Sequence, residues 1–308
     1  MSLFLVLLGL ALLFGGGELL VRGSVALARR LGVSEIAVGV VLVGFGTSAP
    51  ELLVSVESAI LNHPELALGN VLGSNIANIL LIVGVAAVVT PIRLSAGVGW
   101  REAAMVLVAT CIVTALAMAG PLGLWQGVVM LAALLGYLVF CWRLAAPEGA
   151  EIAEEEGPPS STAKACVLAL GGLALLVLGA DLLVEGAIDI ARDFGVSEST
   201  IGLTIVAVGS SLPELAASVV AAFRGRSSVA IGNVLGSNLF NLLGALGIVA
   251  VITPVSTAGP DVHFSLLAML AVTGCFVALI GARHVGRAIG AIFLALYASF
   301  IVMHFAVA

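Results

Sequence analysis

One short segment of this chain places a carboxylic acid in an otherwise apolar stretch. The segment is GTSAPEL (46–52), in which Glu51 follows a proline and two hydroxyl residues. Thr47 and Ser48 lie four and three residues before Glu51, so the three side chains share one face of a helix. Pro50 removes a backbone N–H donor and breaks the helix, which frees the carbonyl four residues earlier. Freed carbonyls inside a membrane must be satisfied by protein, water or an ion.

The same arrangement recurs 163 residues later, in GSSLPEL (209–215). There Ser210 and Ser211 precede Pro213, and Glu214 follows it. A carboxylate at the centre of a membrane span costs roughly 2.5–3.5 kcal/mol to insert. Helix packing explains serine, threonine and proline in a span, but it does not explain two carboxylates at equivalent positions. The pair therefore favours a functional site.

A second duplicated motif supplies further oxygen atoms. It reads GNVLGSNIANIL (69–80) and GNVLGSNLFNLL (232–243), with Gly73 and Gly236 allowing close helix approach. Each copy presents a serine and an asparagine four residues apart: Ser74 with Asn78, and Ser237 with Asn241. Together with the two glutamates, the four hydroxyl residues and the released carbonyls, they predict an all-oxygen cavity. Such ligands suit hard cations such as Ca²⁺, Na⁺ or Mg²⁺ rather than zinc or copper.

The elements that carry these residues are predicted to be membrane-spanning helices. The chain has 308 residues, of which 61% are hydrophobic and 10% charged, and its mean hydropathy is +1.24. Soluble domains are about 45–50% apolar and about 25% charged, so this composition indicates an integral membrane protein. The apolar runs are about 20 residues long, which fits helices rather than barrel strands. The first run has no basic region and no cleavage site, and we expect it to be a retained helix.

Charges, prolines and glycine clusters divide the chain into ten predicted helices. They cover residues 2–28, 34–61, 66–89, 98–119, 122–144, 164–191, 197–223, 228–252, 261–282 and 286–307. An acidic segment, 145–163, separates two sets of five. We expect the five glutamates of this segment to be solvated rather than to bind a regulatory ion: Glu148, Glu151, Glu154, Glu155 and Glu156.

The two sets of helices are copies of one another. Between 17–91 and 180–254, about 35 of about 75 positions are identical without a gap. The predicted organisation is a first repeat over 1–144 with its motif at 44–80, a short cytoplasmic loop over 145–163, and a second repeat over 164–308 with its motif at 207–243.

The basic residues predict that the two repeats have opposite orientations in the membrane. Arginines and the single lysine, Lys164, fall on every odd-numbered connection between the helices. Of the even-numbered connections, only the one between helices 6 and 7 carries a basic residue, Arg192. By the positive-inside rule, both termini lie outside and the acidic loop is cytoplasmic. Inverted repeats with broken helices at the midplane are typical of secondary transporters.

Other ionisable and reactive residues are assigned lesser roles. Glu18 and Asp181 are equivalent positions near helix ends, where a structural role such as pairing with Arg22 suffices. Glu57 has Val220 as its counterpart, and we expect it to line a pathway or an interface. Acids at predicted helix starts (Glu35 after Ser34, Glu198 after Ser197) suit the helix dipole. We expect the four cysteines to be core residues rather than ligands or disulfides: Cys111, Cys141, Cys166 and Cys275.

The two duplicated motifs resemble the alpha repeats of the cation/Ca²⁺ exchanger superfamily, typified by Na⁺/Ca²⁺ exchangers. The resemblance extends over both repeats and the ten-helix layout, and the short central loop is similar to that of the compact prokaryotic members. It implies that Glu51 and Glu214 bind Ca²⁺, that Asn78 and Asn241 close the centre of the site, and that backbone carbonyls near Gly44 and Ala207 contribute. It further implies that six hydroxyl residues complete flanking Na⁺ sites: Thr47, Ser48, Ser74, Ser210, Ser211 and Ser237.

The family also implies alternating access, in which helices 1 and 6 slide across a core of the other eight. One position departs from the pattern: many Na⁺/Ca²⁺ exchangers have aspartate where this chain has Asn241. The site then holds two negative charges, which match one Ca²⁺ or two Na⁺. The stoichiometry and the driving ion are therefore left open.

The sequence predicts a secondary antiporter that exchanges Ca²⁺ for Na⁺ and exports Ca²⁺, in the cell membrane of a prokaryote. The alternatives are a Ca²⁺/H⁺ antiporter and a K⁺-dependent or Mg²⁺-selective exchanger that uses the same carboxylates. The inverted repeat favours alternating access over a channel. No enzyme activity is expected, because the four histidines lie near span ends and leave no base for Ser48 or Ser211. We expect no cofactor, no nucleic acid and no protein partner; the partners are the transported cations and the bilayer.

Overall fold

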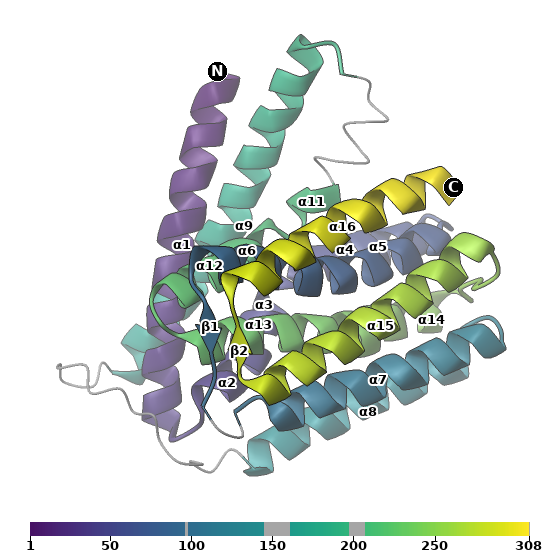
Figure 1. Ribbon diagram of the computed structural model, residues 1–308, viewed down its shortest axis with the longest axis horizontal. Coiled ribbons are helices and arrows are strands. Elements are labelled where there is room, and N and C mark those ends of the chain that lie inside the picture. Colours follow the sequence, from purple (N-terminus) through teal and green to yellow (C-terminus); the bar gives the residue numbers. More distant parts are fainter. Residues whose placement is uncertain (96–97, 145–160, 197–206, 308) are drawn as a thin grey trace.

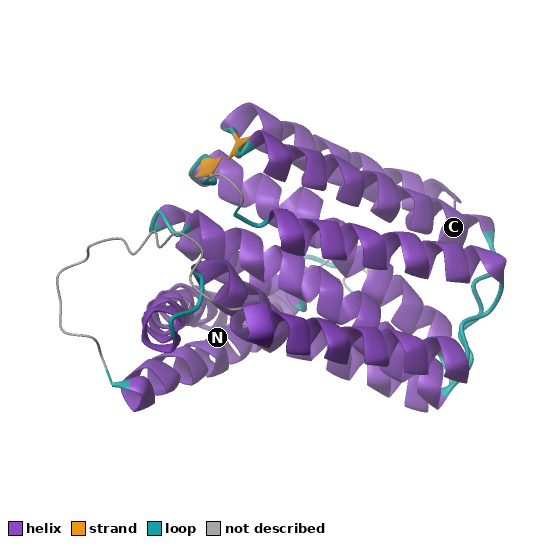
Figure 2. Cartoon of the chain, turned by 90° about the horizontal axis from the view of Figure 1, so that it is seen from below, coloured by secondary structure: helices purple, strands orange, loops and turns teal. Residues whose placement is uncertain are grey.

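Helices form almost all of the described structure, a computed structural model that covers residues 1–95, 98–144, 161–196 and 207–307 (Figure 1). The two longest helices, α1 (Ser2–Leu31) and α9 (Thr162–Asp193), lie side by side and cross the other helices at a steep angle (Figures 1 and 2). Gly32, in the left-handed conformation, ends α1, and the Ser161 side chain caps the start of α9 by accepting a hydrogen bond from the Lys164 N–H.

The first half of the chain contributes seven further helical segments and a short strand. They are α2 (Glu35–Val38), the π-helical η1 (Gly39–Gly44), α3 (Phe45–Thr47), α4 (Ala49–Ile60), α5 (Pro64–Ala77), the π-helical η2 (Asn78–Val83), α6 (Gly84–Val89) and β1 (Ile92–Arg93). Two long helices, α7 (Trp100–Ala119) and α8 (Leu124–Leu144), complete this half. Glu35 lies in the first turn of α2, as predicted, and the Ser34 side chain caps this helix, whereas Ser197 and Glu198 lie outside the described residues.

The second half repeats the order of the described helices, but its strand lies between the last two helices rather than before them. Beyond α9 it contains α11 (Ala207–Gly209), α12 (Leu212–Phe223), α13 (Ser227–Leu239), the π-helical η4 (Phe240–Ala245), α14 (Leu246–Ile252), α15 (Pro260–Ala282), β2 (His284–Val285) and α16 (Arg287–Val307). Helix α5 continues through η2 into α6 as one span, Pro64–Val89, and α13 continues through η4 into α14 as Ser227–Ile252.

Length and composition make this a multi-pass integral membrane protein. Seven described helices are long and apolar enough to cross a membrane alone. The bent pair Glu35–Thr47 and Ala49–Ile60 is an eighth candidate, and two shorter apolar helices cover Leu212–Phe223 and Arg287–Met303. The prediction of an all-helical membrane protein is confirmed. The number of spans stays a prediction, because part of the predicted helix 197–223 lies outside the described residues.

Both motif prolines begin a helix rather than kink one. Pro50 is the second residue of α4, and Pro213 is the second residue of α12. Proline costs nothing at such a position, because the first N–H groups of a helix have no partner within it. The chain bends by 44° at Ser48, between α3 and α4. The breaks therefore lie two or three residues before the prolines, at Ser48 and at residues 210–211.

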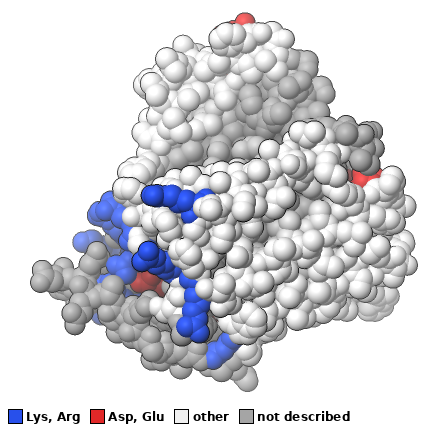
Figure 3. Space-filling view, viewed as in Figure 1, with Lys and Arg blue, Asp and Glu red and all other residues white. Residues whose placement is uncertain are grey.

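The connections between helices meet in two separate groups. Strand β1 pairs antiparallel with β2, so the connection before α7 lies beside the connection before α16. Leu122 and Val255 exchange two backbone hydrogen bonds of 3.0 and 2.8 Å, which joins the connection before α8 to the connection before α15. Lys and Arg side chains gather near the β1–β2 end of the face shown in Figure 3, and the rest of that face is largely uncharged.

Candidate functional site

The two motif glutamates are buried side chains on the first turns of α4 and α12. Glu51 and Glu214 are each only 1% exposed. The break before each helix places a serine against the glutamate of the other repeat. Ser48 Oγ donates a 3.0 Å hydrogen bond to Glu214 Oε1, and Ser211 Oγ donates a 3.1 Å hydrogen bond to Glu51 Oε1. The structure therefore brings the two carboxylates and these two predicted hydroxyl ligands into one buried site.

Helices α5 and α13 bring the second motif to the same site. Asn241 Nδ2 donates to Ser74 Oγ at 3.1 Å, which links the two copies of the motif. Ser237 Oγ donates to the carbonyl oxygen of Gly44 at 3.1 Å, at the end of η1. The predicted backbone ligand Gly44 is thus in place and already accepts a hydrogen bond. Ala207 begins α11, next to the segment outside the described residues.

Four predicted ligand oxygens are buried without a hydrogen-bond partner in the described structure. They are Glu51 Oε2, Glu214 Oε2, Asn78 Oδ1 and Asn241 Oδ1. They form two equivalent pairs, one from each repeat. An unsatisfied buried oxygen is costly, and most such atoms in folded proteins have a partner. Carboxylate and amide oxygens are the ligand types that hard cations prefer.

The remaining predicted ligands differ between the repeats. Thr47 is fully buried, and its hydroxyl lies 3.0 Å from the carbonyl of Val43 and 3.1 Å from Asn233 Oδ1. Its counterpart Ser210 is half-buried and lines a cleft. The two halves of the site are thus built from equivalent residues but have unequal access to solvent.

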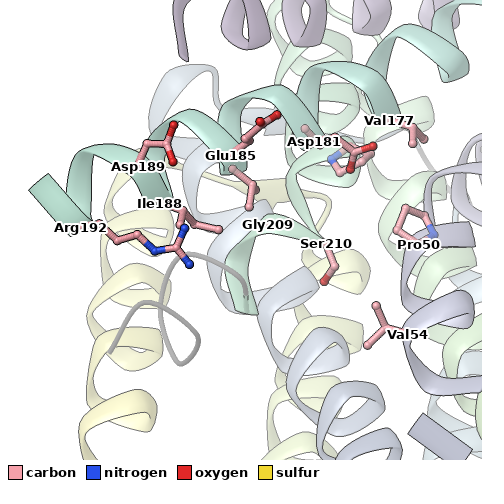
Figure 4. Close-up of a pocket in the computed structure, with 13 residues that line it drawn as sticks. Pro50, Val54, Val177, Asp181, Glu185, Ile188, Asp189, Arg192, Gly209 and Ser210 are labelled. Atoms are coloured by element: carbon pink, nitrogen blue, oxygen red, sulfur yellow. The ribbon is translucent and has the colours of Figure 1, made fainter. Parts of the chain in front are cut away.

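That cleft, of about 500 Å³, lies between α9 and the broken helices (Figure 4). Three acids spaced four residues apart on α9 line it: Asp181, Glu185 and Asp189. Ser210 and both motif prolines, Pro50 and Pro213, also line it. Since the prolines directly precede Glu51 and Glu214, the cleft reaches the immediate neighbours of the site.

The equivalent acid on α1 has different surroundings. Glu18 forms ion pairs with Arg22, one turn along α1, and with Arg224 at the end of α12, where Nε lies 2.7 Å from Glu18 Oε2. The predicted pairing of Glu18 with Arg22 is confirmed. The expected position near a helix end is wrong for both acids, because Glu18 lies well inside α1 and Asp181 lies well inside α9, where it faces the cleft. Glu57 is exposed on α4, and the five glutamates of the acidic segment lie outside the described residues.

Sequence reasoning missed a set of polar residues that surround the ligands. Asn78 Nδ2 donates to Asn238 Oδ1 at 2.9 Å, and Asn238 Nδ2 donates to the carbonyl of Asn75 at 3.3 Å. Asn70 and Asn233 make a second, repeated set of contacts with α4 and α12. The sequence did contain a signal for these asparagines, because each of them is an asparagine in the other repeat as well. Their spacing alone did not show which partners they meet.

Comparison with known proteins identifies the family of this chain. A family model described as sodium/calcium exchanger protein matches residues 1–143 and 164–306, on either side of the acidic segment. The chain belongs to the sodium/calcium exchanger family. The resemblance inferred from the two motifs is thereby confirmed.

Relatives of this exchanger match over nearly the whole chain. CaxA of Alkalimonas amylolytica is 38% identical over 299 residues, covering 94% of each protein. MaX1 of Methanosarcina acetivorans, named a sodium/calcium exchanger, is 30% identical and covers 99% of this chain and 98% of its own. A structure of the sodium-calcium exchanger NCX_Mj, soaked with zero Na⁺ and Ca²⁺, has a TM-score of 0.88 at 30% identity and covers 98% of both chains. These bacterial and archaeal relatives support a location in the cell membrane.

Proposed function

We propose that this protein exchanges Ca²⁺ for Na⁺ across the cell membrane, with Glu51 and Glu214 binding both ions in turn. The observation that carries this proposal is the set of four unpartnered buried oxygens, two carboxylate and two amide, at equivalent positions of the two repeats. Membership of the sodium/calcium exchanger family supports the choice of ions. The cations are the transported substrates, and no cofactor is proposed.

The remaining predicted ligands complete the site in this proposal. Six hydroxyl residues flank the carboxylates and bind Na⁺: Thr47, Ser48, Ser74, Ser210, Ser211 and Ser237. Asn78 and Asn241 close the centre, and the carbonyls of Gly44 and Ala207 contribute. The cross-repeat hydrogen bonds between each serine and the opposite glutamate support this set, since they hold the oxygens of both repeats together.

The exchange follows from competition for two buried charges. Ca²⁺ and Na⁺ neutralise the same carboxylates, so binding of one excludes the other. An uncompensated pair of buried carboxylates is costly in a low-dielectric interior. Only the neutralised site therefore allows α1 and α9 to move across it, and this requirement couples the two fluxes. With Asn241 neutral, the site balances one Ca²⁺ or two Na⁺.

The proposed topology has ten spans in two inverted repeats, 1–144 and 164–308, with both termini outside and the segment 145–163 in the cytoplasm. The two groups of connections support it. The β1–β2 pair joins two connections that carry arginine, and the Leu122–Val255 bridge joins two that carry none. Connections assigned to the same side of the membrane thus contact each other, as an odd number of spans per repeat requires.

The direction in the cell is proposed to be Ca²⁺ export driven by the Na⁺ gradient. A Ca²⁺/H⁺ antiporter, or a K⁺-dependent or Mg²⁺-selective exchanger, would use the same carboxylates. A catalytic role is not proposed, since the site offers cation ligands and the relatives named for an activity are exchangers.

The test is ⁴⁵Ca²⁺ uptake into proteoliposomes under imposed Na⁺, K⁺ or H⁺ gradients. We expect uptake that saturates and that requires an outward Na⁺ gradient. Uptake driven equally well by a pH gradient would contradict Na⁺ coupling, and an ohmic current would contradict exchange. Glu51→Gln and Glu214→Gln should each abolish uptake, because one remaining carboxylate no longer balances Ca²⁺. Substantial exchange by either variant would remove the carboxylates from the mechanism.

A further inference from the structure

Asn233, on α13, forms hydrogen bonds to two other segments of the site, α12 and α3. Its side chain is fully buried in α13. Nδ2 donates to the backbone carbonyl of Glu214 at 3.1 Å and to Ser218 Oγ at 2.8 Å, both on α12. Its Oδ1 accepts a 3.1 Å hydrogen bond from the hydroxyl of Thr47, which belongs to the other repeat.

Asn70 is the equivalent residue of the first repeat and makes the equivalent donor contacts. Its Nδ2 donates to the backbone carbonyl of Glu51 at 3.1 Å and to Ser55 Oγ at 2.9 Å, both on α4. The geometry is thus duplicated to within about 0.1 Å. The repeats differ at the carboxamide oxygen of the asparagine. Asn233 Oδ1 meets Thr47, whereas the counterpart of Thr47 in the other repeat, Ser210, lines the cleft.

We propose that Asn70 and Asn233 are positioning residues of the cation site, and that Asn233 also tunes Na⁺ binding through Thr47. This rests on the proposed function, in which Glu51 and Glu214 bind both ions and Thr47 completes a flanking Na⁺ site. In this proposal neither asparagine is a direct ligand of a cation.

A carboxamide suits this position because it carries two N–H donors and one acceptor oxygen. Both donors of Asn233 point to α12, so the carboxamide fixes α13 against α12 at the residue that carries the carboxylate. Asn70 fixes α5 against α4 in the same way. A ligand displaced by a few tenths of an ångström loses ion affinity, so a bond to the glutamate backbone influences both cations.

The contact with Thr47 has a more selective consequence. A hydroxyl has one hydrogen and two acceptor lone pairs. When the Thr47 hydrogen is directed to Asn233 Oδ1 or to the carbonyl of Val43, the lone pairs are left for a cation. Asn233 therefore helps to orient a ligand assigned to Na⁺, whereas Asn70 has no such contact among the described residues.

The chain offers a matched pair for the test, Asn70→Ala and Asn233→Ala. Half-saturating Na⁺ and Ca²⁺ concentrations and maximal rates would be measured in proteoliposomes. We expect both variants to raise the half-saturating Ca²⁺ concentration by similar factors. Asn233→Ala should raise the half-saturating Na⁺ concentration about fivefold more than Asn70→Ala, as one lost hydrogen bond predicts. Maximal rates should change less than about twofold. Equal Na⁺ shifts in the two variants would overturn the role of Thr47.

A double-mutant cycle tests whether Asn233 acts through Thr47. In a Thr47→Val background, Asn233→Ala should raise the half-saturating Na⁺ concentration no more than Asn70→Ala does in the same background. The hydrogen bond between Thr47 and Asn233 is already absent there. Independent, additive effects would overturn the proposal. Ser218→Ala is the control for a merely structural role, since it removes another hydrogen bond of Asn233. It should lower thermal stability without the Na⁺ shift.

A second pair keeps the test decisive if Asn233→Ala does not fold. Asn70→Asp and Asn233→Asp each remove the N–H donors of the carboxamide and add the same charge. The carboxylate introduced by Asn233→Asp, however, still offers Thr47 an acceptor oxygen. The half-saturating Na⁺ concentration should therefore rise equally in both variants, and a larger rise for Asn233→Asp would overturn the proposal. The wild-type protein separates the two hypotheses. Without Na⁺-driven uptake by the wild type, the proposed function fails; with normal uptake and unchanged affinities in both alanine variants, only the positioning role fails.

Discussion

At the scale of single residues, reciprocal hydrogen bonds between the two repeats hold the site together. Each glutamate accepts a hydrogen bond from a serine of the opposite broken helix, which leaves one oxygen of each carboxylate unpartnered in the described structure. Hydrogen bonds to a charged group contribute about 1.5–3 kcal/mol. The serine thus orients the carboxylate of the other repeat, and its loss should weaken binding of every cation that the carboxylate holds.

Ser48→Ala removes the hydroxyl that contacts Glu214 Oε1. We expect the half-saturating Ca²⁺ and Na⁺ concentrations both to rise, by about tenfold or more, because the lost bond is charge-assisted. Ion-dependent uptake into proteoliposomes measures both values.

Ser58→Ala is the control for this substitution. Ser58 lies on α4, the helix that follows Ser48, but its hydroxyl donates back to the carbonyl of Val54 at 2.8 Å, away from the carboxylates. It should leave both values within about twofold of the wild type. Equal effects of Ser48→Ala and Ser58→Ala would show that the cross-repeat hydrogen bond does not support ion binding.

The sequence predicted which residues gather at the site, because helical spacing fixes which side chains share a face. Spacing placed Ser48 with Glu51 and Ser74 with Asn78, and duplication indicated that both copies act together. It did not predict that Ser48 contacts Glu214 or that Asn233 contacts Thr47, because these contacts depend on how α4 and α13 cross the opposite repeat. Only the three-dimensional packing determines that crossing.

At the scale of elements, α1 and α9 pack through glycines spaced seven residues apart. Gly9 and Gly16 of α1 meet Gly179 and Gly172 of α9, so the helices run antiparallel. A Cβ atom at Gly16 would lie 2.8 Å from the carbonyl oxygen of Gly172, and one at Gly9 would lie 2.7 Å from that of Gly179. Such close backbone approach makes the two helices a single packed unit.

Gly16→Ala should therefore destabilise the protein, because the new methyl group meets backbone that cannot rotate away. Overpacking of this kind costs about 1–3 kcal/mol. Gly15→Ala is the matched control one residue away, where a Cβ atom meets nothing within 4 Å. Thermal unfolding of the purified protein should show a lower midpoint for Gly16→Ala and no loss for Gly15→Ala. If both variants unfold alike, close packing of α1 on α9 is not a source of stability.

The helix interiors contain a feature that sequence patterns do not reveal. The π-helical segments η2 and η4 begin at Asn78 and Phe240, where the two central asparagines lie. Such wide turns insert one extra residue into the helical hydrogen-bond pattern and often occur at functional sites. The apolar periodicity of a fully buried span does not distinguish them from ordinary α-helix. The spans were therefore predicted, but the turns that aim the asparagines were not.

At the scale of the whole molecule, the surroundings of the cation site differ between its α9 side and its α1 side. On the side of α9, Asp181 and Glu185 line an open cleft. On the side of α1, the equivalent acid Glu18 is paired with Arg22 and Arg224, and the second of these ion pairs ties α1 to the end of α12. Neither arginine has a basic counterpart in the other repeat, because Glu185 corresponds to Arg22 and Leu61 corresponds to Arg224. The cleft on the α9 side thus reaches Ser210 and the two motif prolines beside the site, whereas the two glutamates are buried.

Cysteine labelling tests this one-sided access with the pair Ser210→Cys and Thr47→Cys, in a background without the four native cysteines. Ser210 is half-buried and lines the cleft, whereas its repeat counterpart Thr47 is 0% exposed. In the absence of Na⁺ and Ca²⁺, a membrane-impermeant thiol reagent should modify the Ser210→Cys variant at least about tenfold faster than the Thr47→Cys variant, because only a hydrated thiol ionises and reacts readily. In the proposed topology the reagent reaches the thiol of the Ser210→Cys variant from the side of the termini and not from the side of segment 145–163. Equal labelling of the two variants, or labelling of the Ser210→Cys variant only from the loop side, would contradict access through this cleft from the side of the termini.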